Sequence, residues 1–350
     1  MSPLPRLGVA AAVVLSIVAG QQRSRQVLAA PGTGAPQAPS RLSETGLYAS
    51  GQAGQIDPRN RAFSPQYPLW SDGAHKSRWV FLPDAAVIDA RSADWNLPVG
   101  TRFWKEFRFG DRKVETRMLW KTGAADWTAV SYVWNAEQTD ATLAPPEGVP
   151  NVAAIAPGRA HSIPSRTDCL ACHGAKRTTA LGFNLLQLST DRDPNAIHGE
   201  PLEPGMVTLA TLVREERLAP LDRTLVSQPP RIATRDPQTR TVLGYFAANC
   251  GTCHNGSDEI AVQGPSLKFS NLLADADAVA GNLVGHRTAW QVPGVADGQS
   301  VLIDPRTPYQ SAMLVRMRSR RPSSQMPPLG TVVRDEAAVA ALAQWIGRSH

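Results

Sequence analysis

The stretch Phe103-Trp-Lys-Glu-Phe-Arg-Phe109, followed by Gly110-Asp111 and then by Val114-Glu-Thr-Arg-Met-Leu-Trp120, gives the clearest indication of the fold. In an extended chain the three phenylalanines of the first run fall on one face, and the second run alternates in the same way. A glycine and an aspartate between two alternating runs favour a tight turn. The sequence therefore predicts a β-hairpin.

The residues around this hairpin also have the composition of strands. Seven of the nine tryptophans lie between Trp70 and Trp134, in short alternating runs separated by Gly, Pro and Asp. We expect further strands at Arg78 to Leu82 and at Trp127 to Trp134, where Val130, Tyr132 and Trp134 share a face. Together these runs predict a β-rich, β-sandwich-like domain over residues 43–160.

The pentapeptide Cys-x-x-Cys-His occurs twice, as Cys169-Leu-Ala-Cys172-His173 and as Cys250-Gly-Thr-Cys253-His254, and these stretches contain all four cysteines. Two thiols three positions apart can add to the two vinyl groups of one porphyrin, and the adjacent histidine can then bind the iron. The pattern predicts two covalently bound haem c groups. Their cofactor-binding residues are Cys169, Cys172, Cys250 and Cys253, and their proximal iron ligands are His173 and His254.

Two other readings of the cysteines are weaker. A tetrathiolate zinc site usually draws its cysteine pairs from within about 20 residues of each other, and these pairs are much farther apart. Two local disulfides in an exported protein are the other alternative. Both readings leave the histidine after each second cysteine without a role.

The N-terminus predicts export. Arg6 precedes an apolar run, residues 7–20, that is short for a membrane span but suits a signal peptide, with small residues that allow cleavage after Gly20 or Ala29. We expect a signal peptide over residues 1–30, a flexible leader over 31–42 and a periplasmic location. Export agrees with covalent haem, because bacteria attach it outside the cytoplasm. The alternative is an uncleaved N-terminal anchor.

The charge pattern limits the class of partner. The formal net charge is +6, and arginine is dense at Arg316, Arg318, Arg320 and Arg321. A nucleic-acid partner is not expected, because no nucleic-acid-binding motif and no interleaving of basic and aromatic residues is found. The patch is a solvated face or a docking surface for an acidic redox protein, donor or acceptor, with peripheral membrane association as a further option.

The remaining chain divides into a first haem-binding segment, residues 161–235, and a compact cytochrome c-like domain, residues 236–350. The first segment contains one expected helix, Met206 to Leu218, and an apolar wall for haem 1 from Leu181, Phe183, Leu185 and Leu186. The second has expected helices at Thr239 to Asn249, Pro308 to Met317 and Asp335 to Gly347. The predicted fold class is α+β, an N-terminal β-sandwich-like unit followed by an α-helical class I cytochrome c-like domain.

Met326 is the predicted sixth ligand of haem 2. Its loop, Gln325-Met-Pro-Pro-Leu-Gly330, is stiffened by two prolines, and histidine–methionine ligation suits electron carriage. Met313 and Met317 lie four residues apart on an expected helix, a spacing more typical of core packing. His286 is a remaining competitor.

The sixth ligand of haem 1 is left open by the sequence. His198 is ranked first and Met206 second, both after the motif, and His161, just before it, is ranked third. An open coordination site is the fourth alternative, and it would allow the iron to bind a small ligand.

The chain resembles a family of exported dihaem c-type cytochromes of poorly defined role, sometimes grouped with parallel β-helix proteins. The resemblance runs from about Leu42 to the C-terminus. It rests on the stretches Pro65-Gln-Tyr-Pro-Leu-Trp-Ser-Asp-Gly-Ala74, Pro98-Val-Gly-Thr-Arg-Phe-Trp-Lys-Glu-Phe107, Val114-Glu-Thr-Arg117 and Tyr132-Val-Trp-Asn135, on Asp168 to Gly174 with Leu181-Gly-Phe183, and on Leu243 to Asn255 with the Met326 loop. It implies an exported dihaem electron-transfer protein.

The leading functional prediction is a carrier that passes electrons between redox partners, with no catalytic residues of its own. The alternative is a haem-based, peroxidase-like oxidoreductase with an open site at haem 1. Bacterial dihaem peroxidases also carry two such motifs, but in two similar cytochrome-like domains and farther apart. A third alternative, a structural protein with metal or disulfides in place of haem, would be colourless.

Overall fold

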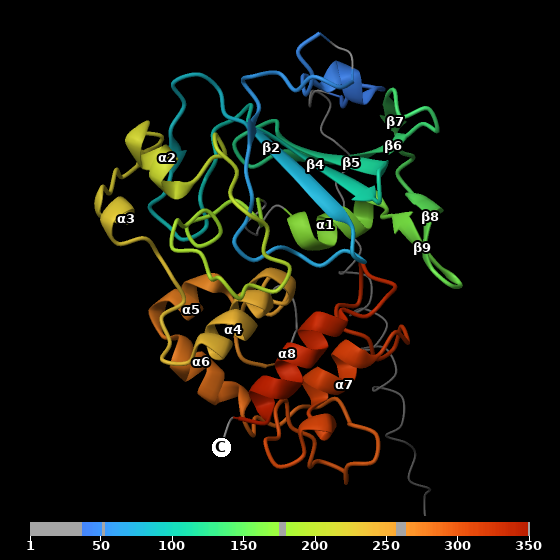
Figure 1. Cartoon of the computed structure of the whole chain (residues 1–350), viewed down its shortest axis with the longest axis vertical. Helices are drawn as coiled ribbons and strands as arrows, with labels where there is room; N and C mark the ends of the chain where they lie inside the picture. Colours follow the sequence, from blue (N-terminus) through green and yellow to red (C-terminus); the bar gives the residue numbers. More distant parts are fainter. Residues whose placement is uncertain (1–36, 51–52, 175–179, 257–263, 349–350) are drawn as a thin grey trace, which may run out of the picture. The chain divides into compact units, whose positions relative to one another are not determined.

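The computed structural model describes residues 37–50, 53–174, 180–256 and 264–348 (Figure 1). Residues 38–350 cluster as one compact unit, and the architecture below is that of this unit. The predicted signal peptide and most of the leader lie outside the described residues. No helix among the described residues is long and apolar enough to cross a membrane.

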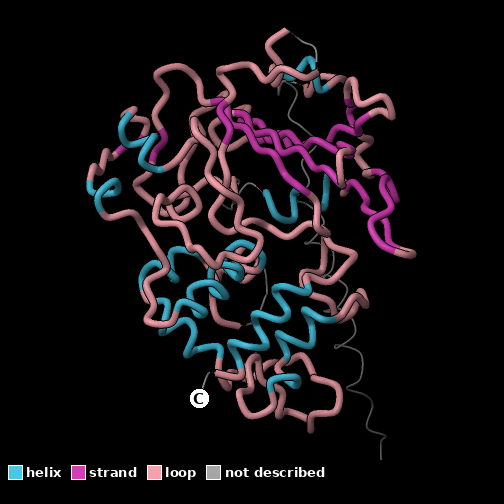
Figure 2. The backbone as a smooth tube through the Cα atoms, viewed as in Figure 1, coloured by secondary structure: helices cyan, strands magenta, loops and turns pink. Residues whose placement is uncertain are grey.

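A six-stranded sheet in the order β1-β2-β4-β5-β6-β7 dominates the first half of the unit (Figure 2). Every pairing in this sheet is antiparallel. Its strands are β1 Arg61–Ala62, β2 His75–Phe81, β4 Arg102–Phe109, β5 Arg112–Lys121, β6 Trp127–Trp134 and β7 Ala141–Leu143. Two small two-stranded sheets join β3 Ile88–Asp89 to β10 Leu218–Ala219 and β8 Val149–Ala156 to β9 Arg159–Ile163.

The two faces of the large sheet are covered differently. One face carries Trp104, Met118, Tyr132 and Trp134, which pack with Leu42 and its neighbours in one apolar cluster. We call this the tryptophan face. The opposite face is apolar at one end, where Val80 and Phe103 pack against Phe183 and Leu209, and charged at the other. We call this the charged face.

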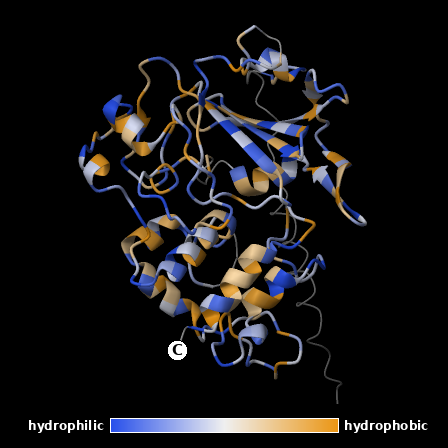
Figure 3. Ribbon diagram, in the orientation of Figure 1, coloured by the Kyte–Doolittle hydropathy of each residue, from blue (hydrophilic) through white to orange (hydrophobic). Residues whose placement is uncertain are grey.

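Helices follow the sheet along the chain, and α4 to α8 build a separate apolar cluster, whereas α2 packs under the sheet. They are α1 Arg166–His173, α2 Leu209–Arg214, α3 Thr224–Ser227, α4 Pro237–Asn249, α5 Phe269–Ala274, α6 Ala276–Leu283, α7 Ala312–Arg318 and α8 Glu336–Ile346, with short 3-10 turns η2 Leu42–Thr45 and η3 Pro308–Gln310. Helix α4 begins after the N-cap Asp236 with Pro237 in its first turn, which suits a helix start. It packs against α5, α6 and α8. Figure 3 shows hydrophobic residues dominating α8.

Two long-range contacts join the sheet region to the helices. The Asp72 carboxylate, just before β2, accepts hydrogen bonds from the backbone of Val332 and Val333, some 260 residues later. Asn249, at the end of α4, accepts a 2.7 Å hydrogen bond from the Trp70 backbone. The loop before β2 therefore contacts both the end of α4 and the segment before α8.

The predicted fold class is wrong. The β-rich region is built on one six-stranded antiparallel sheet and not on a β-sandwich, and the second half is not an α-helical class I cytochrome c-like domain. Helices are a minority of the described residues, and most are short. Residues 284–311 are largely loop, joined by isolated bridges such as Val284 with Ile303. Local periodicity identified individual helices but did not show how much irregular chain separates them.

Several single elements were predicted well. The hairpin is confirmed as β4 and β5, and β6 has the predicted bounds Trp127–Trp134. The expected helices at residues 239–249 and 335–347 correspond to α4 and α8. The helix expected over residues 206–218 is shorter, because Thr208 caps it and the chain leaves it at Glu215. Residues 308–317 form η3 and then α7, not one helix.

Candidate functional site

The first Cys-x-x-Cys-His motif lies on α1. Ser165 caps the helix, because its Oγ accepts a hydrogen bond from the Asp168 backbone while the Asp168 carboxylate accepts one from the Ser165 backbone. This reciprocal pair fixes the helix start at Arg166, three residues before Cys169. Helix α1 packs against β6 (Figure 1). The motif is therefore presented to the sheet by a short, well-capped helix.

A row of cationic side chains crosses the charged face of the sheet near α1. Arg78 of β2 pairs with Lys105 of β4, Lys105 pairs with Arg117 of β5, and Arg117 pairs with Ser131 of β6. Directly opposed residues in antiparallel strands share a face and lie close together. We call Arg78, Lys105 and Arg117 the cation row. Arg117 also interacts electrostatically with Cys169 and Cys172, so the row begins beside the first motif.

The cation row is only partly neutralised by protein carboxylates. Arg78 binds Glu200 at 2.5 Å, and Arg117 binds Glu115 at 2.6 Å. Lys105 has no hydrogen bond or ion pair with a carboxylate among the described residues, and its ammonium lies 4.9 Å from the centre of the Phe107 ring. Burial, followed by repulsion from Arg78 and Lys76, lowers the pKa of Lys105 well below its usual range.

A buried cluster of charge lies next to the cation row. His161 Nε2 is 2.9 Å from Glu115 Oε1, and His161 Nδ1 is 3.9 Å from Asp72. Burial opposes the charged form of His161, but the contacts with Asp72 and Glu115 outweigh it, and the pKa of His161 is raised. Burial likewise opposes ionisation of Glu115, yet Arg117 and His161 hold its pKa at about 2. We call Glu115, His161 and Asp72 the His161 cluster.

The second motif starts where α4 ends. The Cys250 backbone donates to the Phe246 carbonyl at 2.8 Å, and the His254 backbone donates to the Cys250 carbonyl at 2.8 Å. The motif therefore continues the helix as a compact turn. Burial, and then the neighbouring Cys253, raise the pKa of the Cys250 thiol to about 12. Burial, with a smaller contribution from Arg316, lowers the pKa of His254, which favours the neutral imidazole needed for iron binding.

Arg316 connects this motif with the Met326 loop. Its carbonyl accepts a 3.0 Å hydrogen bond from the Met326 backbone, while its guanidinium, near enough to affect His254, also donates to the Ser324 carbonyl. Both ends of Arg316 therefore hold the loop that carries Met326. Met326 remains the predicted sixth ligand of haem 2, and its loop is anchored to a residue that interacts with His254.

Buried donors without partners provide a test of whether a large polar ligand fits near the second motif. Within the described residues, Trp70 Nε1 and the Nε and Nη1 atoms of Arg320 are buried and make no hydrogen bond. Trp70 is next to Asn249 through its backbone, and Arg320 interacts with Tyr245 on α4. Buried donors are normally satisfied. The haem propionates would supply acceptors for such donors, so the residues present fit a haem.

The candidates for the sixth ligand of haem 1 are placed in different surroundings. His198 stacks on Trp70 at 4.7 Å, and its Nε2 lies 2.8 Å from Asp335, the N-cap of α8. Met206 lies shortly before α2 and donates its backbone N–H to Glu203. His161 is 3% exposed, with both nitrogens directed at carboxylates, so it is held as part of a buried charge cluster. His198 and Met206 remain predictions.

The other residues that the sequence analysis named are placed in the core or on the surface, away from a single site. Met317 lies in the helical core cluster and Met313 packs against it, as their spacing indicated. The expected apolar wall for haem 1 is divided, because Phe183 lies under the sheet and Leu186 in the helical cluster. In the arginine patch, Arg318 and Arg321 are exposed, whereas Arg316 and Arg320 are partly buried.

The alternative metal site receives no support from the placement of the cysteines. Among the described residues no group of three or more His, Cys, Asp or Glu side chains is arranged to hold a metal ion. The two cysteine pairs thus stay apart, each with its own histidine. A single tetrathiolate zinc site would require them to meet.

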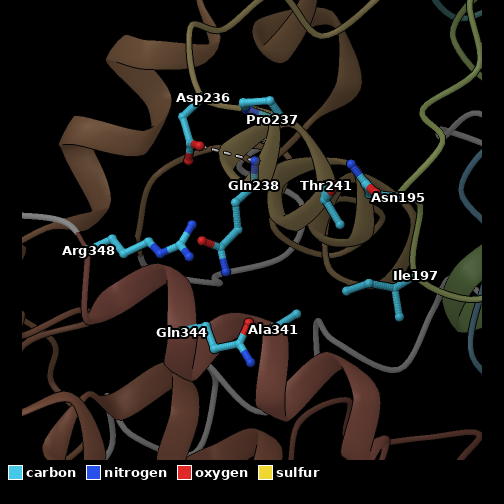
Figure 4. A pocket seen from close by; sticks show the side chains of 9 residues that line it. All are labelled: Asn195, Ile197, Asp236, Pro237, Gln238, Thr241, Ala341, Gln344 and Arg348. Carbon is cyan, nitrogen blue, oxygen red and sulfur yellow. Dashed lines mark hydrogen bonds between the residues drawn. The ribbon is translucent and has the colours of Figure 1, made fainter.

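One open pocket of about 400 Å³ lies between the start of α4 and α8 (Figure 4). In Figure 4 the side chains of Gln238 and Arg348 point toward each other across it. It is lined by Asn195, Ile197, Asp236, Pro237, Gln238, Thr241, Ala341, Gln344 and Arg348. None of these residues belongs to a cysteine motif, so we do not assign this pocket to the candidate site.

No protein-family model, curated protein or solved structure matches this chain. The family resemblance inferred from the motifs therefore remains a prediction. The cation row and the His161 cluster were not predicted from the sequence. The row could have been found from the alternation of the strands, because Arg78, Lys105 and Arg117 occupy positions on the same face of the sheet as the buried apolar residues Val80 and Phe103.

Proposed function

We propose that this protein is an exported dihaem c-type cytochrome that carries electrons between redox partners. The observation that carries the proposal is the pair of Cys-x-x-Cys-His motifs within one compact unit, the first on α1 and the second at the end of α4. Cys169 and Cys172 would hold haem 1, with His173 as its proximal ligand. Cys250 and Cys253 would hold haem 2, with His254 and Met326 on its iron.

A set of contacts between the first motif and the segment after Met326 supports transfer within one chain. Arg117, beside the first motif, binds Glu115, and Glu115 binds His161. His161 faces Asp72, which holds the backbone of Val332 and Val333 shortly after Met326. The Met326 loop and the first motif are thus connected through a few side chains.

Haem would supply the reversible one-electron change at iron. The residues of this chain would bind the porphyrin, orient each proximal histidine and set the local electrostatic field. The second motif is partly buried, since Cys250 packs against the helical core cluster and burial lowers the pKa of His254. Partial burial limits the access of solvent to the iron, which suits an electron carrier.

The first test is the absorption spectrum of the full chain exported with a cytochrome-maturation system, oxidised and reduced, with haem quantified against protein. We expect two low-spin c-type haems per chain. The double variants Cys169→Ala/Cys172→Ala and Cys250→Ala/Cys253→Ala should each retain one. A colourless wild-type protein would refute the proposal, and a high-spin haem that turns over peroxide would replace the carrier with a peroxidase-like enzyme.

A further inference from the structure

The charged face of the sheet carries more positive charge than the protein neutralises. Lys76, on the strand that carries Arg78, adds a fourth cation to the row, and its ammonium donates to the Leu69 carbonyl. Glu115 and Glu200 are the two carboxylates that pair with members of this group. Four cations against two carboxylates leave a formal excess of two positive charges.

This excess is held in partly or fully buried surroundings, where like charges repel strongly. Burial lowers the pKa of Lys76 to about 8, and Arg78 adds to the effect. Glu115 is also shared with His161, so it cannot be assigned to Arg117 alone. Buried charges are normally paired. The described residues provide no carboxylate partner for Lys76 or Lys105, and a bound anion would favour the charged form of both.

An independent observation marks the same row as a polar binding surface. Ser131 continues the row on β6, is 6% exposed, and its Oγ has no hydrogen-bond partner among the described residues. Helix α1, with the first motif, packs against this strand. A buried hydroxyl without a partner beside three aligned cations indicates a ligand that accepts hydrogen bonds.

We propose that the cation row binds the two propionate groups of the haem attached at Cys169 and Cys172. The proposal rests on the proposed function and adds a role for the sheet. The row starts at Arg117, which interacts with both cysteines, and extends over two further strands to Arg78. Two strand spacings measure about 10 Å. That span is comparable with the width of a porphyrin, whose propionates lie opposite its thioether edge.

Two carboxylates from one haem match the formal excess of two positive charges. Arginine suits bidentate carboxylate binding, and lysine adds a mobile charge. Lys105 is the residue that best tests the proposal, because it lies between the two arginines and has no carboxylate partner of its own among the described residues. The sheet would then act as the floor of the first haem site.

The experiment compares the full-length dihaem protein with its Lys105→Gln variant by spectroelectrochemical titration. The wave of haem 1 is identified as the one lost in Cys169→Ala/Cys172→Ala. We expect Lys105→Gln to keep two haems and to lower the midpoint potential of haem 1, because removal of a cation favours ferric iron. A tenfold change in the reduction equilibrium corresponds to 59 mV for one electron. Lys105→Arg should restore the potential.

Lys113→Gln is the matched control. Lys113 is also a partly buried lysine of this sheet that lies over an aromatic ring, but its partners, Trp134 and Glu106, are not part of the cation row. It should leave haem 1 unchanged. If Lys105→Gln does not fold, Lys76→Gln removes another cation of the same group and should shift the same wave in the same direction.

Added succinate separates a propionate site from a site for a soluble dicarboxylate. If the propionates fill the row, succinate should not bind the dihaem protein through Lys105 and should not shift haem 1. Binding of succinate that disappears in Lys105→Gln would overturn the proposal. So would an unchanged haem 1 potential in a folded Lys105→Gln protein with two haems, whereas a wild-type chain without haem would instead refute the proposed function.

Discussion

His161 Nε2 lies 2.9 Å from Glu115 Oε1, and the same carboxylate binds Arg117 at 2.6 Å. Glu115 is therefore a completely buried anion shared between a histidine and an arginine. Arg117 is neutralised by Glu115, and His161 by Glu115 together with Asp72. This arrangement makes the His161 cluster sensitive to the loss of a single carboxylate and to pH.

The Glu115→Gln variant should be strongly destabilised. The substitution keeps the shape of the side chain but leaves the partly buried Arg117 guanidinium and the buried His161 without their shared counter-ion. Because Arg117 is partly exposed, we expect a loss of about 2–3 kcal/mol, below that of a fully buried pair. Urea unfolding followed by circular dichroism measures the effect. Arg223→Gln, which removes an exposed ion pair with Glu216, serves as the control and should change stability little. Equal losses in the two variants would contradict this account.

Stability should depend on pH in two separate windows. The pKa of Glu115 is depressed to about 2, so its contribution is complete above the unfolded value near 4.5 and is lost as pH falls toward 2. The pKa of His161 is raised, so its contribution is complete below 6.5 and is lost as pH rises through the folded value. The charged groups that face His161 are Glu115 and Arg117 from β5 and Asp72 from the loop before β2.

Urea midpoints measured from pH 3 to pH 9 test this dependence. The contribution of the His161 cluster to the stability of wild type should be largest between about pH 4.5 and 6.5. His161→Gln should lose the decline at the alkaline side, because it has no proton to release. A variant that declined there as steeply as wild type would show that another group is responsible.

Gly244 allows close packing between α4 and the loop before β2. A methyl group added at this position would lie 2.1 Å from Cε1 of Tyr67, whose ring is 1% exposed. Gly244→Ala should therefore destabilise the protein by about 1–3 kcal/mol through overpacking, despite the better helix propensity of alanine. Gly281→Ala is the matched control, because no atom within 4 Å meets its added methyl group on α6. It should be neutral or stabilising, and a stabilising Gly244→Ala would disprove the close contact.

Met326→Leu tests the predicted sixth ligand of haem 2. Leucine fills a similar volume but cannot bind iron, so the protein should fold while haem 2 loses its methionine-ligated spectrum and its potential falls. Met313→Leu, at a core position, should leave both properties unchanged. Retention of a low-spin, high-potential haem 2 in Met326→Leu would rule out the assignment.

The sequence predicted the features that depend on the spacing of residues close together in the chain. The hairpin followed from alternation around Gly110-Asp111, and α4 followed from apolar spacing together with Asp236 and Pro237 at its start. The motifs themselves predicted four thiols and two histidines for haem. These features need no knowledge of distant partners.

The fold class and the charged site could not be predicted in the same way. Whether β4 belongs to a single sheet or to a sandwich depends on what covers its faces, and Leu42 and Phe183 lie far from it in the sequence. The contact of Asp72 with Val332 joins residues 260 positions apart. Likewise, Arg78, Lys105 and Arg117 become neighbours only through strand register.

The strand register of the β4–β5 hairpin has a further consequence for evolution of the chain. Deleting one residue between the two strands would turn every side chain of β5 to the opposite side. Arg117 and Glu115 would then enter the apolar layer beneath Trp104, and Met118 would replace them beside α1. Length changes in this short turn should therefore be far less tolerated than substitutions in it, because a single missing residue would remove an aromatic core and an ionic surface together.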